Sequence, residues 1–402
     1  MLKHQFVTSG AVAVALAITV GSPAVATSHQ EQSPEAYRGA GNGASDLPDV
    51  SVNGRYVVFQ SSSTNLVPGD TNARIDVFLR DTALNKTRLI SKARAGGPAN
   101  GDSTDAVVSD DGKIIVFTST ASNIVAGDTN GKPDVFRTDL STGITTRVST
   151  SQTVTQANKE SKRGRISSDG KTVAFISSAT NIVPGDTNNV QDIFVRTYAT
   201  ATVKRVSTTP NGTQLTVPSY SPSVSFDGKA VGWINDPFGD PAVNAWCGSV
   251  GKTLAVLSKK VSSATRPVVV EAVCKSSYLD KVVDPRINMT GKIGFTLLSN
   301  GGYAMFAARG QGALVTYNYN ADYYTRTWWD EGRWGSAMVS TSEYDDYLHV
   351  NDTATGEKDI YWPANSLAMS PDGTTIALQD RSNRQVYIYN HNSGDSKLVS
   401  QS

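Results

Sequence analysis

The sequence has 402 residues, and its 37 Lys and Arg against 36 Asp and Glu give a formal net charge of +1. This balance argues against nucleic acid as the main partner, because phosphate binding needs a basic surplus or a clustered basic face. The 39% hydrophobic content is typical of a folded globular chain and excludes a disordered one. Two Cys and four His leave little material for a Cys-rich zinc site or for His-based catalysis.

Residues 1–26 are predicted to be a secretory signal peptide. Lys3 and His4 precede an apolar run over residues 11–20, and Ala24-Val25-Ala26 forms an A-x-A cleavage pattern. The apolar run is shorter than the roughly 20 residues that cross a bilayer as a helix. The alternative is an uncleaved anchor. We therefore expect a secreted or extracytoplasmic protein of the bacterial cell envelope, with no membrane span after signal removal.

Residues 27–46 are rich in Gly, Ser and charged residues and are predicted to be a flexible lead-in, followed by a folded unit over residues 47–402. Export makes a disulfide between Cys247 and Cys274 chemically permissible. Two buried free thiols are the alternative, because sequence alone does not fix the distance between the two residues.

A period of 58 residues runs through the first half of the sequence. Several landmarks recur in one register, which composition alone does not produce. They are Phe59, Phe117 and Phe175; Asn65, Asn123 and Asn181; Gly69, Gly127 and Gly185; Asp76, Asp134 and Asp192; Phe78, Phe136 and Phe194; and Ser91, Ser149 and Ser207.

Each repeat is predicted to form four strands. In the second copy, residues 106–109 form a short strand, and Asp111-Gly112 forms a hairpin turn, since Gly accepts the positive φ of a type I′ turn. Residues 113–118 are β-branched or aromatic and are expected to be buried on both faces. Two further strands start at residues 134 and 144.

A single sheet with two apolar faces is not stable alone in water, whereas sheets packed face to face around an axis bury one another. We therefore predict an all-β fold, a β-propeller of four-stranded antiparallel blades. The turn glycines give seven blades, and six blades plus an insertion is the alternative. They are Gly54, Gly112, Gly170, Gly228, Gly291, Gly332 and Gly373. Residues 35–47 could close the ring as an extra strand, although the last repeat supplies four strands of its own.

The repeat S-x-DG-K-x-V-A-F, followed by N-[LI]-V-x-G-D-T-N and D-[VI]-F-x-R, resembles the TolB-like, WD40-like β-propeller repeat of bacterial exported proteins. Residues 163–196 match this pattern closely, as do residues 51–80 and 107–137. The resemblance is specific over residues 47–208 and poor between residues 259 and 362. It implies a propeller that acts as a protein-binding platform, and it implies no reaction.

The G-D-T-N loops offer side-chain oxygens in a D-x-N-x-x-x-D spacing, which suits a hard cation such as Ca²⁺. The alternative, which we favour, is that these Asp and Asn side chains cap the amides of their own loops. The residues are Asp70, Asn72 and Asp76; Asp128, Asn130 and Asp134; and Asp186, Asn188 and Asp192. We expect no required cofactor, with Ca²⁺ as the one ion that the loops suit.

Residues 317–362 are rich in Tyr and Trp. Flat rings with polar edges stack on sugars or anchor proteins, although packing inside a divergent blade is the favoured interpretation. The candidate ligand-binding residues are Trp328, Trp329, Trp334 and Asp330.

Motifs for catalysis are absent from the sequence. There is no G-x-S-x-G or H-E-x-x-H, and Gly251-Lys252-Thr253 lacks the first Gly of a phosphate-binding loop, where Trp246 stands. We therefore predict no catalytic residue and expect an exported, non-catalytic propeller that binds a protein or cell-envelope component through its loop rim. A propeller that binds or cleaves polysaccharide through residues 317–362 is the alternative.

Overall fold

The structure is a computed structural model that describes residues 39–208, 212–235, 362–390 and 392–402, together with the strand backbones between residues 253 and 361. Throughout these residues the regular secondary structure is β-strand. Consistent with this, none of the described segments is a helix with the length and apolar character needed to cross a membrane.

The first three sheets each contain four consecutive strands in chain order, paired antiparallel. Their strands are β1 (Ser45–Val50), β2 (Tyr56–Ser61), β3 (Asp76–Asp81) and β4 (Lys86–Leu89); β5 (Ser103–Val108), β6 (Ile114–Ser119), β7 (Asp134–Asp139) and β8 (Ile144–Arg147); and β9 (Ser161–Ile166), β10 (Thr172–Ser177), β11 (Asp192–Thr197) and β12 (Thr202–Arg205).

Four further sheets follow, of which one has three described strands and the others have four. Their strands are β13 (Ser219–Val224), β14 (Ala230–Asn235), β15 (Thr253–Lys260) and β16 (Val268–Cys274); β17 (Leu279–Ile287), β18 (Ile293–Ser299), β19 (Ala304–Arg309) and β20 (Leu314–Tyr319); β21 (Ala337–Thr341), β22 (Tyr347–Asp352) and β23 (Gly356–Tyr361); and β24 (Ala364–Met369), β25 (Thr375–Asp380), β26 (Val386–Asn390) and β27 (Ser396–Leu398).

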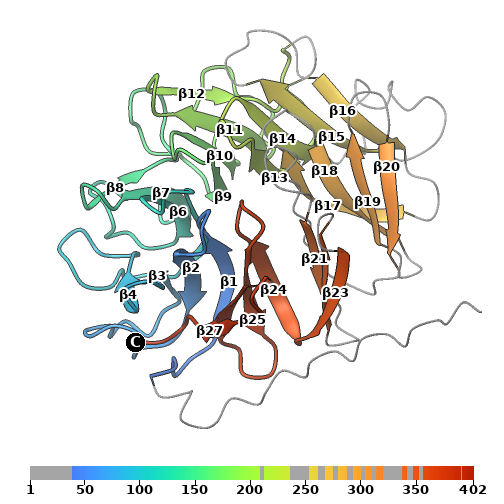
Figure 1. Ribbon diagram of the computed structural model, residues 1–402. Helices are drawn as coiled ribbons and strands as arrows, with labels where there is room; N and C mark the ends of the chain where they lie inside the picture. The colour runs from blue at the N-terminus through green and yellow to red at the C-terminus, as the bar shows by residue number, and fades with distance from the viewer. Residues whose placement is uncertain are drawn as a thin grey trace, which may run out of the picture.

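The sheets follow one another around a common centre (Figure 1), which confirms the predicted β-propeller. The first strand of a sheet lies against the first strand of the next, from β1 to β5, β9, β13 and β17, and β24 returns to β1. These first strands therefore line the centre, and the fourth strands form the outer edge.

The predicted burial of both faces of the second strand is confirmed in the second repeat and recurs in the third. All six residues of β6 and of β10 are buried. A stacked phenylalanine pair recurs in the first three sheets, with ring centroids 5.8 Å apart for Phe59 and Phe78 and 5.7 Å apart for Phe117 and Phe136. Val58 and Leu79 of the first sheet share one core cluster with residues of the second sheet, so neighbouring sheets bury each other's apolar faces.

The turn glycine between the first and second strands also sets how closely two sheets approach. Gly112 has a φ of +71°, and a Cβ built there would lie 2.0 Å from the Tyr56 ring of the preceding sheet. Gly170 has the same relation to Ile114, at 2.5 Å. Only a residue without a side chain fits both the turn and this contact.

Each of the first four inner strands is interrupted by a β-bulge. The residue at the bulge has a positive φ, and the four positions are again 58 residues apart. They are Leu47, Asp105, Arg163 and Ser221.

The ring closes without an exchanged strand. The last sheet supplies β24 to β27, and residues 39–41 pair with residues 400–402 beside it. Ala40 forms an isolated bridge with Gln401, and the Gly41 N–H donates to the carbonyl of Ser400 at 3.0 Å. Residues 39–46, which fall in the predicted lead-in, thus include the pairing to the last sheet and the start of β1.

Candidate functional site

Two sets of loops form one face of the first three sheets. We call residues 62–75, 120–133 and 178–191, which join the second strand to the third, the rim loops. We call residues 90–102, 148–160 and the described part of 206–218, which lead to the next sheet, the connectors. The two sets contact each other directly, because the Ile75 N–H of a rim loop donates to Oδ1 of Asp102 in a connector at 3.2 Å.

In each of the first three sheets an asparagine pair joins the segment before the first strand to the rim loop. The Asn100 N–H donates to Oδ1 of Asn123 at 3.0 Å, and Oδ1 of Asn100 accepts the Ser122 N–H at 2.9 Å. Asn158 and Asn181 repeat the contact at 2.9 Å. Asn42, which precedes β1, makes it with Asn65 at 2.9 Å. The rim is therefore held in the same way at three junctions.

A buried carboxylate lies at the base of each rim loop, where the third strand begins. Oδ1 of Asp76 accepts the Ser91 hydroxyl at 2.5 Å, and Asp134 with Ser149 and Asp192 with Ser207 have the same distance. All three aspartates are 0% exposed. The serine comes from the connector, so this contact ties the connector to the third strand.

In the second and third repeats an arginine from the fourth strand lies between two aspartates. Arg147 forms ion pairs of 3.2 Å with Asp128 and 3.3 Å with Asp134. Arg205 forms ion pairs of 2.9 Å with Asp186 and 3.6 Å with Asp192. The guanidinium supplies the positive charge that two carboxylates need at a buried position.

A glutamine from the connector completes these two networks. Nε2 of Gln156 donates to Oδ1 of Asp128 at 2.9 Å and to Oδ2 of Asp134 at 3.0 Å. In the third repeat Oε1 of Gln214 accepts a hydrogen bond from Nη1 of Arg205 at 2.9 Å. Each aspartate pair therefore has at least two side-chain partners.

The first repeat has neither partner. Leu89 occupies the position of Arg147 and Arg205, and Pro98 occupies the position of Gln156 and Gln214. Asp70 and Asp76 are still present, and Asn72 donates its side-chain amide to Oδ2 of Asp76 at 2.7 Å.

The pKa values of the rim aspartates reflect these surroundings. Burial raises the pKa of Asp76 to about 6, with the charges of Asp70 and Asp102 acting in the same direction. Burial also raises the pKa of Asp134 and of Asp192, and there the nearby arginine opposes the shift. In the first repeat the arginine that opposes this shift is missing.

The predicted metal ligands lie where the sequence suggested, at the rim loops. Within the described ranges, no three His, Cys, Asp or Glu side chains gather at one point. The Asn72 and Asn130 side-chain oxygens accept loop N–H groups at 2.9 and 2.8 Å, as expected for amide capping. In the second repeat Asp128 and Asp134 both pair with Arg147. In the third repeat Asp186 and Asp192 both pair with Arg205. Ca²⁺ binding at these loops stays a prediction.

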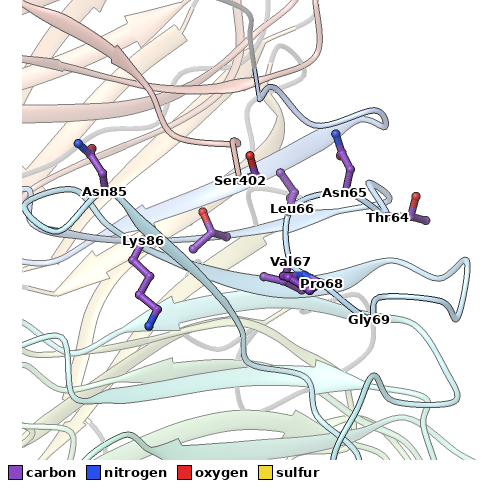
Figure 2. A pocket seen from close by; sticks show the side chains of 10 residues that line it. Thr64, Asn65, Leu66, Val67, Pro68, Gly69, Asn85, Lys86 and Ser402 are labelled. Atoms are coloured by element: carbon purple, nitrogen blue, oxygen red, sulfur yellow. The ribbon is translucent and has the colours of Figure 1, made fainter.

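A pocket of about 440 Å³ lies at the outer edge of the first sheet (Figure 2). Asn85 and Lys86 lie on one side, Leu66 to Pro68 on the other, and Ser402 between them. On the corresponding edge of the third sheet, Oε1 of Gln152 accepts the Val203 N–H at 2.9 Å. Thr87, which lines the pocket, corresponds to Val203. The pocket therefore lies along the edge of the fourth strand, which in the third sheet binds the side-chain amide of Gln152.

The tips of the connectors differ in one respect. Gly96 and Gly212 have φ values of +90° and +82°, and Val154 stands at the corresponding position of the second connector with a φ of +65°. The Val154 side chain is 76% exposed. A β-branched residue is strained in this conformation.

The other predicted site residues lie outside the residues whose side chains the structure describes. They are Trp328, Trp329, Asp330 and Trp334, with the cysteines Cys247 and Cys274. At the end of that segment Trp362 is buried, and its indole N–H donates to Asp380 at 3.1 Å. The roles of Arg147 and Arg205 were not predicted, although their spacing of 58 residues was visible in the sequence.

Comparisons with known proteins support the fold and leave the activity open. No protein-family model matches the chain, and no curated protein matches it in sequence. The β-propeller domain of the Trilobed protease from Pyrococcus furiosus, described as having an open velcro topology, has a TM-score of 0.53 at 11% identity over 90% of this chain and 96% of its own.

Two further solved structures are similar. A prolyl endopeptidase has a TM-score of 0.54 at 11% identity over 90% of this chain, which spans only 50% of the endopeptidase. A protein described as TolB from Agrobacterium tumefaciens has a TM-score of 0.42 at 14% identity, over 69% of this chain and 81% of its own. The prolyl endopeptidase is about twice as long as the matched region.

Proposed function

We propose that this chain is an exported, non-catalytic β-propeller that binds a protein or a cell-envelope component through the face formed by its rim loops and connectors. The observation that carries the proposal is Val154, an apolar side chain that is 76% exposed on a strained backbone at the tip of a connector. Backbone strain of this kind clusters at binding and active sites.

The internal structure of the rim supports this assignment. The buried aspartate, serine and asparagine contacts hold each loop from within, as with Asp134 and Ser149 at 2.5 Å. Outward-facing side chains such as Thr129 and Lys132 are exposed on this frame. A rigid frame with exposed side chains loses little conformational entropy when it binds a partner.

Export follows from the predicted signal peptide. N-terminal sequencing of the mature protein from its producing cell tests it, and a start after Ala26 is the expected result. A start at Met1 in the cytoplasmic fraction would contradict it.

Site-specific photocrosslinking tests the binding face. A photoreactive residue at position 154 is expected to crosslink to one discrete partner in the envelope fraction. The matched control is position 84, because Leu84 is also exposed, at 61%, but lies in the turn between β3 and β4 at the opposite end of its sheet. Equal crosslinking at both positions, or none at position 154, would reject the rim as the binding face.

A further inference from the structure

The first repeat retains an aspartate pair, but two side chains that accompany this pair in the next two repeats are replaced by apolar residues. Asp70 and Asp76 stand where Asp128 and Asp134, and Asp186 and Asp192, stand in the next two repeats. The arginine and the glutamine that serve those pairs are replaced by Leu89 and Pro98. Both apolar replacements occur in the same repeat, while both carboxylates remain.

The backbone register shows that the replacement is at the same point of the sheet. Leu89 pairs with Phe78, as Arg147 pairs with Phe136 and Arg205 with Phe194. The other contacts of the network are unchanged, since Ser91 still donates to Asp76 at 2.5 Å and Asn72 donates to the Ala99 carbonyl at 2.9 Å. What this repeat lacks is the positive charge of the arginine and the side-chain amide of the glutamine.

Asp70 shows directly that a partner is missing. Its side chain is buried, with 6% of the residue exposed, and its Oδ1 has no hydrogen-bond partner. The corresponding oxygen of Asp128 accepts Nε2 of Gln156 at 2.9 Å. A buried, unpartnered carboxylate oxygen beside a second buried carboxylate is costly unless a cation or a proton neutralises the pair.

We infer that the first repeat binds one hard divalent cation of the Ca²⁺ class between Asp70 and Asp76, at the place that a guanidinium takes in its two neighbours. The two carboxylates offer oxygen ligands, although Oδ2 of Asp76 also accepts the Asn72 side-chain amide at 2.7 Å. Ca²⁺ prefers carboxylates completed by carbonyl groups and water. Because the site lies inside the rim and needs no partner, this inference is independent of the proposed binding role.

The test measures the thermal stability of the full chain near neutral pH in the presence of a chelator and then of calcium chloride at about 1 mM, a concentration matched to extracellular sites. We expect calcium to raise the melting temperature by several degrees and a calorimetric titration to give about one Ca²⁺ per chain. Asp70→Asn and Leu89→Arg are each expected to abolish the response, the second because it restores the arginine of the neighbouring repeats.

The control is Asp128→Asn, the same substitution in the second repeat, which is expected to leave the calcium response intact. If Leu89→Arg fails to fold, Asp70→Asn alone decides the result, because the amide has the same shape as the carboxylate. The inference is overturned if calcium has no effect on the wild-type chain or if its effect survives Asp70→Asn. It is also overturned if mild acid stabilises the chelated protein and calcium does not, since a shared proton then occupies the site.

Discussion

The hydroxyl of Ser149 donates to the buried carboxylate of Asp134 at 2.5 Å and accepts the N–H of Val135 at 3.1 Å. One small side chain thus serves an acceptor and a donor that are both buried. Ser91 and Ser207 make the same pair of contacts in the neighbouring repeats.

Ser149→Ala is expected to lower the free energy of unfolding by about 2 kcal/mol, because it leaves a buried carboxylate oxygen and a buried N–H without that partner. Chemical denaturation of the wild type and the variant measures the difference. Ser141→Ala, at an exposed turn, is the control and should change stability by less than about 0.5 kcal/mol. Equal effects at the two positions would show that the hydroxyl contributes no more than a surface group.

Arg55 is expected to control stability at acid pH through Asp81. It donates to both carboxylate oxygens, at 3.1 and 3.0 Å, and these hydrogen bonds hold the pKa of Asp81 below its usual value. A lowered folded-state pKa stabilises the fold above about pH 4, the unfolded value, and this contribution is lost as the pH falls through the folded-state pKa. The Arg55→Gln variant should therefore be less stable than the wild type at neutral pH. Its free energy of unfolding should also fall by less than that of the wild type when the pH is lowered.

Urea unfolding at pH 7, 4 and 3 checks this expectation. Lys113→Gln is the control, because Lys113 and Asp111 form a pair whose side chains are 62% and 50% exposed, where solvent screens the charges. A parallel pH profile for wild type and Arg55→Gln would contradict the assignment.

Relief of strain at position 154 should stabilise the fold. Val154→Gly and Val154→Asn are both expected to raise the free energy of unfolding by about 1 kcal/mol, since both residues tolerate positive φ better than valine. Gly96→Val at the corresponding position of the first connector should lower it. Loss of stability in both Val154 variants would show that the valine packs favourably, and the argument for its role in binding would fail.

The junction at residues 39–41 and 400–402 is expected to tolerate a covalent link. The Ser402 N–H donates to the Gly39 carbonyl at 2.9 Å, just as the Ala93 N–H donates to the Gly97 carbonyl at 3.0 Å within the continuous first connector. A chain that starts at Gly97, ends at Ala93 and joins Ser402 to Gly39 through Arg-Ala-Gly should melt within a few degrees of the chain it is derived from.

Deletion of residues 400–402 is the contrasting variant. Ser400 accepts the Val386 N–H at 3.0 Å and donates to Gln385 at 2.7 Å, so its loss is expected to cost roughly 2–4 kcal/mol. If the deletion is harmless and the permuted chain unfolds, the paired ends do not hold the first and last sheets together.

The repeat period predicted most of the architecture. Identical landmarks 58 residues apart gave the four strands of each early sheet, and the second strand expected at residues 113–118 is β6 at Ile114–Ser119. The prediction of these strands was correct because a strand that is buried on both faces needs a continuous run of apolar residues, and such a run is visible in the sequence. The bulges at Leu47, Asp105 and Arg163 were not predicted, because an aliphatic, an acidic and a basic side chain share no property that marks a positive φ in the sequence.

The candidate site was predicted only in part. The Asp and Asn residues of the rim loops were identified, but their partners Arg147 and Arg205 lie on the outer strand, and no loop motif includes them. The period of 58 residues also shows that Leu89 stands where Arg147 and Arg205 stand in the next two repeats. The importance of this replacement depends on two buried carboxylates lying near one cation. That proximity is a property of the folded sheets, which the spacing of residues along a chain does not specify.

The glycines at the hairpin turns have a consequence for how such a protein can change in size. Gly54, Gly112 and Gly170 each fit closely against the first residue of the second strand in the preceding sheet, which is Thr375, Tyr56 or Ile114. Because the fit needs only the absent side chain, the residue that the glycine meets can differ from one of these junctions to the next, including the junction of the last sheet with the first. Duplication or loss of a whole repeat would therefore keep this turn contact at the junctions that the structure describes, whereas a fractional copy would interrupt it.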